Sequence, residues 1–115
     1  MRVMPIVSIL VALAAAPVFA DCTPPDGNVQ IPNGATATRD DMIAAQKAVK
    51  AYDTAVKAYG ECLQQDEEAK VAAGADKSKL TVQYAKLNNT QVDKLQQVAG
   101  KFNDELHAYK AKNSG

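Results

Sequence analysis

Only a few side chains in this sequence are of types that do chemistry. His107 is the single histidine, and Asp104 and Glu105 lie close to it, so the three could be drawn as a metal or acid–base site. Metal sites usually have more nitrogen or sulfur ligands, and an acid three residues from a histidine is common on a solvated helix face. One histidine also supports no Ser-His-Asp set, and no glycine-rich phosphate loop is present. We therefore predict no catalytic residue, no metal site, no cofactor and no enzymatic activity.

A run of three carboxylates, Asp66-Glu67-Glu68, has the ligand type that Ca²⁺ prefers. Successive residues of a helix point about 100° apart, so these side chains would not converge on one ion. We expect the run to lie on a solvated face.

The first twenty residues have the pattern of a secretory signal. Arg2 gives a short basic start, an apolar run follows over residues 6–18, and Val18-Phe19-Ala20 suits a cleavage site. We expect cleavage after Ala20 and a periplasmic, exported protein. The apolar run is too short to span a bilayer comfortably and no second run follows, so we expect no membrane span.

The two cysteines, Cys22 and Cys62, are the remaining reactive groups. Disulfides persist in exported proteins, so one bridge between these two is expected, which leaves no free thiol. Whether this bridge is structural or redox-responsive stays open. A lipid anchor on Cys22 is the alternative, but Asp21 stands where that signal needs a small uncharged residue, and we expect no anchor.

Charge and size limit the partners and the core. The chain has 13 basic and 13 acidic residues, and removing Arg2 with the signal leaves 12 basic residues and a formal charge of −1. This balance gives no electrostatic reason to expect nucleic acid or an anionic membrane as a partner. Because a chain of this size buries little, we expect support from the disulfide, from self-association, or from both.

The exported part begins with an arm that cannot be helical. Residues 21–37 contain three prolines together with Asp-Gly and Asn-Gly pairs, which favour an extended path with turns. Thr38 and Asp41 then form a capping-box pattern, which predicts the start of a helix.

Two helices are predicted in the remaining part, residues 38–115. The first covers about residues 39–73, Gly74 ends it, and the second covers about residues 77–111. Each helix has one apolar seam with steps of three and four residues. The first seam is Met42, Ala45, Val49, Tyr52, Val56, Tyr59 and Leu63, and the second is Leu80, Tyr84, Leu87, Gln91, Leu95, Val98, Phe102, Leu106 and Tyr109.

These seams predict an all-α fold, an antiparallel two-helix hairpin of coiled-coil type. In the register that we predict, Leu63 lies opposite Leu87, and Val49 lies opposite Phe102. A single continuous helix through Gly74 is the alternative, since a glycine costs only about 1 kcal/mol inside a helix.

A row of small residues lies beside the first seam: Ala44, Ala48, Ala51, Ala55, Ala58 and Cys62. Small side chains allow another segment to approach the helix backbone closely. The arm is long enough to reach from Cys22, bonded to Cys62, back to Thr38, because its 16 steps span about 50 Å when extended. We therefore expect the arm to run along this alanine row.

Residues 22–63 contain a cysteine, several prolines, Ile-Pro-Asn-Gly, Ala-Thr, an acidic-Met helix start and Tyr…Cys-Leu. This pattern resembles small exported proteins of Gram-negative proteobacteria, in which Asp is expected at the position of Asn33. The resemblance implies export and the tethered arm, and it implies no activity.

From these patterns we predict a protein that acts by protein–protein interaction, in a structural or adaptor role and with a second copy as one possible partner. The alternative is a small periplasmic holdase that binds unfolded exported proteins in a groove wider than the arm covers. The residues expected to touch a partner are those of the two seams. They are Val49, Tyr52, Val56, Tyr59, Leu95, Phe102 and Tyr109.

Overall fold

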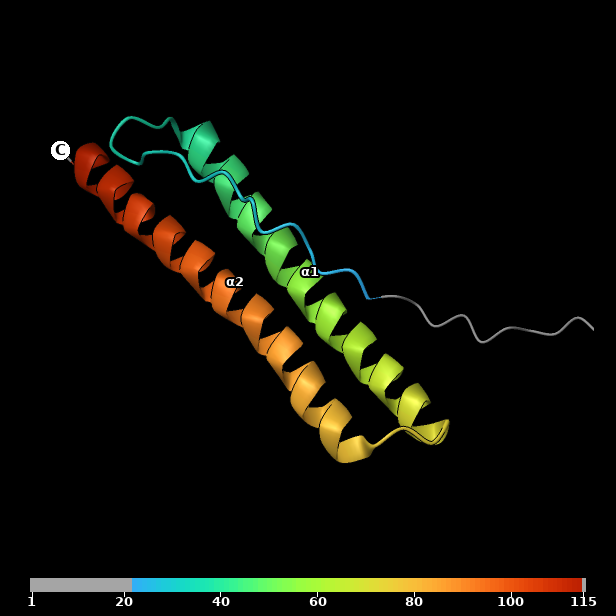
Figure 1. Ribbon diagram of the computed structural model, residues 1–115. Helices are drawn as coiled ribbons and strands as arrows, with labels where there is room; N and C mark the ends of the chain where they lie inside the picture. Colours follow the sequence, from blue (N-terminus) through green and yellow to red (C-terminus); the bar gives the residue numbers. More distant parts are fainter. Residues whose placement is uncertain (1–21, 115) are drawn as a thin grey trace, which may run out of the picture.

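The protein is a hairpin of two long antiparallel helices. The computed structural model describes residues 22–114. Helix α1 covers Arg39–Ala72 and helix α2 covers Lys77–Asn113, and the two lie side by side along most of their length (Figure 1). No described residue belongs to a strand. The predicted all-α hairpin is therefore confirmed.

Local sequence signals set the helix ends. Thr38 caps α1, since its hydroxyl accepts from the Asp41 amide and the Asp41 carboxylate accepts from the Thr38 amide. Asp76 caps α2 by accepting from the amides of Ser78 and Lys79. The ends observed differ from those predicted by one residue for α1 and by two residues for α2.

Gly74 breaks the chain between the helices. It has φ = 102°, a conformation that suits glycine and ends a helix. The amide of Ala75 bonds back to the Lys70 carbonyl, which satisfies one of the last carbonyls of α1. The alternative of a continuous helix is thus wrong.

The core between the helices includes two clusters of buried residues, one towards each end, with buried Tyr52 and Val56 between them along α1. Near the start of α1, a cluster of Ala37, Met42, Ala45 and Phe102 is joined by Ile31 from the arm. Near the connection, Tyr59, Leu63 and Tyr84 form the second cluster.

The contacts near the connection agree with the predicted register. Tyr84, three residues before Leu87, bonds to Asp66, three residues after Leu63, which places the two leucines at the same level of the antiparallel pair. Both leucines line the same small hollow. The packing nevertheless buries them unequally, since Leu63 packs with Tyr84 and is buried, whereas Leu87 is 43% exposed.

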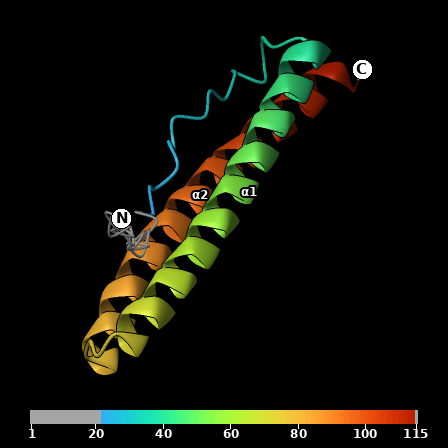
Figure 2. The ribbon, with the colours of Figure 1, turned by 90° about the vertical axis from the view of Figure 1, so that its right-hand side faces the viewer.

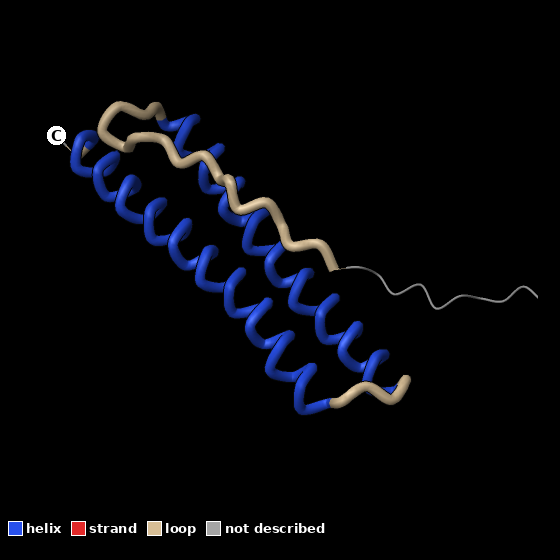
Figure 3. The backbone as a smooth tube through the Cα atoms, in the orientation of Figure 1, coloured by secondary structure: helices blue, strands red, loops and turns tan. Residues whose placement is uncertain are grey.

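The arm returns along the helix pair in the direction opposite to α1 (Figures 1 and 3). The view turned by 90° shows it running along one side of the pair (Figure 2). Its first described residue, Cys22, forms the predicted disulfide with Cys62 of α1, with a Cα–Cα distance of 5.8 Å. Within residues 22–114, no helix is long and apolar enough to cross a membrane.

Candidate binding groove

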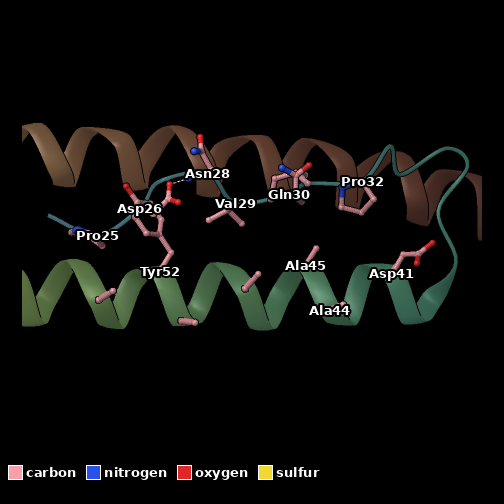
Figure 4. Close-up of a pocket in the computed structure, with 14 residues that line it drawn as sticks. Pro25, Asp26, Asn28, Val29, Gln30, Pro32, Asp41, Ala44, Ala45 and Tyr52 are labelled. Carbon is pink, nitrogen blue, oxygen red and sulfur yellow. Dashed lines mark hydrogen bonds between the residues drawn. The ribbon is translucent and has the colours of Figure 1, made fainter.

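The arm and α1 border an open groove of about 740 Å³. One wall is the arm, from Pro25 to Pro32, and the other side is the row of alanines on α1 (Figure 4). Val29 points from the arm towards α1, while Asn28 points away from it. The groove is thus apolar along its length, with polar groups at its rim.

The alanine row forms the floor of this groove and is not covered by the arm. Ala44, Ala48, Ala51 and Ala58 are exposed and Ala55 is half-buried. The arm therefore runs beside this row, as predicted, but does not cover it. Alanine offers little apolar area to bury, so the arm gains more by packing Ile31 onto the cluster that both helices form.

Two anchors hold the arm. At one end the disulfide ties Cys22 to α1. At the other, the amide of Gly34 donates a 2.6 Å hydrogen bond to the Glu105 carboxylate of α2. Between these anchors, residues 23–33 make no hydrogen bond to either helix. The arm is thus tied to α1 at one end and to α2 at the other, and between these anchors it is held by packing, chiefly that of Ile31 onto the core cluster.

Tyr52 connects the floor of the groove with the arm. Its side chain rises from α1 towards the arm near Asp26 (Figure 4), and the residue is only 4% exposed. A β-carbon at Gly27 would lie 3.0 Å from the Tyr52 hydroxyl oxygen, so the arm crosses close to the end of this ring. The hydroxyl is buried and makes no hydrogen bond to any residue of 22–114. Such a group costs about 1–3 kcal/mol relative to a bonded one.

The groove is acidic. Asp26 and Asp41 are among its lining residues, and none of the lining residues is basic. The pKa of the Asp41 carboxyl is lowered by its hydrogen bonds with Thr38. The bond from the Thr38 backbone N–H contributes most, and the Thr38 side chain contributes next. Asp41 therefore stays ionised at neutral pH, and the groove favours a cationic partner over an anionic one.

A second polar cluster lies next to the disulfide, outside the groove. The Tyr84 hydroxyl donates to the Asp66 carboxylate, and the Lys70 ammonium donates to the Tyr84 oxygen at 2.7 Å and pairs with Asp66 at 2.9 Å. These bonds, from Tyr84 first and Lys70 second, lower the pKa of Asp66. They raise the pKa of Tyr84, chiefly through Asp66, and the pKa of Lys70, chiefly through Tyr84.

This cluster was missed by the sequence reasoning, which placed Asp66 on a solvated face. The side chain is only 12% exposed, because it points towards α2. The signal available in the sequence was the spacing of Asp66 and Lys70, four residues apart on one face. Only the packing of the helices showed that Tyr84 lies between them.

The side chains predicted to touch a partner lie largely inside the hairpin. Tyr52, Val56, Tyr59 and Phe102 are buried, and the other three, Val49, Leu95 and Tyr109, are half-buried. The two helices use these side chains to bind each other. A partner that approaches the intact hairpin therefore meets the alanine row and the arm instead.

The remaining candidates for chemistry are not brought together. His107 and Asp104 are exposed, and Glu105 is used at Gly34. Among the described residues, no three His, Cys, Asp or Glu side chains are placed to hold a metal ion.

Comparison with family models, with curated proteins and with solved structures finds no match to this chain. The fold and the groove therefore carry the functional argument by themselves.

Proposed function

We propose that this protein is exported to the periplasm and acts there by protein–protein interaction, in a structural or adaptor role. The disulfide and the N-terminal signal pattern both support export, since disulfides persist outside the cytoplasm. The proposed partner is another polypeptide, which includes a second copy of this chain.

The groove between the arm and the alanine row is the observation that supports this role most strongly. It is open, apolar along its floor, and bounded by a segment with few bonds to the rest of the molecule. Open apolar surfaces with a polar rim are typical of interaction sites. The seam residues, by contrast, are occupied by the hairpin itself.

The first test is the mass of the exported protein in solution, measured by light scattering after size exclusion, with and without reductant. A stable oligomer that loosens on reduction supports a structural role through self-association. A monomer that binds a partner polypeptide in a defined ratio supports an adaptor role. A monomer that binds no polypeptide contradicts the proposal.

A small holdase for unfolded exported proteins is the second candidate. A holdase needs a groove that is wider than the part covered by the arm. The groove floored by the uncovered alanine row supports this role. The folded protein would then bind an apolar dye and slow the aggregation of a reduced, unfolded protein at equimolar ratio. Absence of both effects while the protein still binds a defined partner would leave the adaptor role alone.

A further inference from the structure

We propose that the groove binds one extended peptide segment of a partner protein, with small apolar side chains and at least one basic side chain. This inference rests on the proposed interaction role and names the chemistry of the partner. Four properties of the groove lead to it: its length, its floor, its charge and its unpaired polar groups.

Length and floor determine the conformation and the side chains of the segment. The alanine floor from Ala44 to Ala55 extends over roughly 16 Å at 1.5 Å per helical residue. An extended chain advances about 3.3 Å per residue, so about five residues lie along this floor. Alanine side chains leave space for small or medium apolar groups, while Val29 and Ile31 complete the apolar lining.

The charge of the lining residues determines the sign of the charge that the bound peptide should carry. Asp26 and Asp41 lie among the lining residues, and none of the described residues that line the groove is basic. The Asp26 carboxylate accepts one bond from the Asn28 amide, and Asp41 accepts one from the Thr38 amide. Both carboxylates keep further acceptor capacity for a lysine or arginine.

Unpaired polar groups complete the argument. The amides of Gln30 and Ile31 make no hydrogen bond within the described part of the chain. An extended peptide next to an extended arm can pair with such groups as a strand does at a sheet edge. Tyr52 lines the same groove, and its hydroxyl is buried beneath Gly27 of the arm without a partner among the described residues. Because residues 23–33 make no hydrogen bond to either helix, a small shift of this part of the arm would expose the hydroxyl to the peptide.

The test is a binding measurement on the protein purified after export, with its disulfide intact. The probe is a fluorescein-labelled octapeptide of alternating alanine and valine with a lysine at each end, followed by fluorescence anisotropy. The matched probe has a glutamate at each end. We expect saturable binding of the basic peptide and at least about tenfold weaker binding of the acidic one, since the two differ in sign towards both carboxylates.

Three substitutions locate the site. Ala51→Leu fills the floor and weakens binding by about tenfold, because the larger side chain occupies the space of the peptide. Asp26→Asn weakens it by about threefold, the range of an exposed charge pair. Tyr52→Phe weakens binding by about fivefold through a lost hydrogen bond, while the melting temperature stays the same or rises, because an unpaired buried hydroxyl is removed. A purely structural Tyr52 would leave peptide affinity unchanged.

Ala85→Leu is the control, because Ala85 is an exposed alanine of α2 that does not line the groove. Equal peptide affinity of Ala51→Leu, Ala85→Leu and the unchanged protein would overturn the inference. So would a protein that binds no peptide but loses self-association with Ala51→Leu, since the groove would then hold a second copy and only the interaction role would stand. A monomer that binds neither peptide nor partner would overturn both proposals.

Discussion

Gly34 of the arm lies directly against the backbone of α2 at Glu105. Its amide donates a 2.6 Å hydrogen bond to the Glu105 carboxylate, and a β-carbon on Gly34 would overlap the Glu105 carbonyl oxygen. The backbone angles at position 34 do not require glycine, because φ is positive at Gly74 and not at Gly34. Position 34 needs glycine because no side chain fits between the arm and the helix.

Gly34→Ala is therefore expected to detach this end of the arm from α2. The backbone carbonyl cannot move aside as a flexible side chain would, so the free energy of unfolding should fall by about 2 kcal/mol, a typical cost of overpacking. Thermal unfolding followed by circular dichroism measures this loss. The control is Gly100→Ala, at a helical position where a β-carbon meets nothing within 4 Å. It should stabilise by about 0.5–1 kcal/mol, and a similar response of both variants would contradict the contact at Gly34.

Removing the disulfide with Cys62→Ser should lower the melting temperature strongly. The bridge joins residues 40 apart in sequence, and closing such a loop stabilises by about 4 kcal/mol through chain entropy. In thermal unfolding, the oxidised protein should have a high melting temperature, while the reduced protein and the Cys62→Ser variant should both have a low one. The Cys62→Ser variant has no bridge, so reductant should leave its melting temperature unchanged. A lower melting temperature of the variant in reductant would show that the effect of reductant does not come from the disulfide.

A matched pair of leucine substitutions tests the unequal burial of Leu63 and Leu87. Leu63→Ala removes a buried side chain of the cluster near the connection and should cost about 2–4 kcal/mol, while Leu87→Ala removes a side chain that is 43% exposed and should cost less than about 1 kcal/mol. Chemical denaturation with urea gives both values. Equal losses would contradict this difference in burial.

The Asp66 cluster should make stability depend on pH at the acid end. The pKa of Asp66 is lower in the folded protein than in the unfolded chain, so its contribution is present above the unfolded pKa and is lost as pH falls through the folded one. We expect the melting temperature to decrease as the pH is lowered beneath about 4, and the Asp66→Asn variant to show a smaller decrease.

Asp104→Asn serves as the control for this pH series, because it removes a carboxylate from an exposed position. A melting temperature that falls equally with acid in the protein and in both variants would show that the Asp66 cluster adds nothing to the pH dependence.

The sequence determined the parts of this protein that depend on neighbours along the chain. Prolines excluded a helix before Thr38, the Thr38–Asp41 capping box began α1, and Gly74 ended it. The three-and-four spacing of apolar residues identified the face of each helix that is buried, and two cysteines allowed one bridge. Each of these follows from local geometry or from elimination.

Tertiary packing decided what depends on the shape of the space between elements. It buried Leu63 against Tyr84 and left Leu87 43% exposed, because the spacing of the apolar residues does not specify the volume available at each level of the pair. It seated Gly34 on α2, drew Ile31 into the shared core and left the alanine row uncovered. The groove therefore could not be predicted from the sequence, since alanine permits close approach but supplies too little apolar area to compel it.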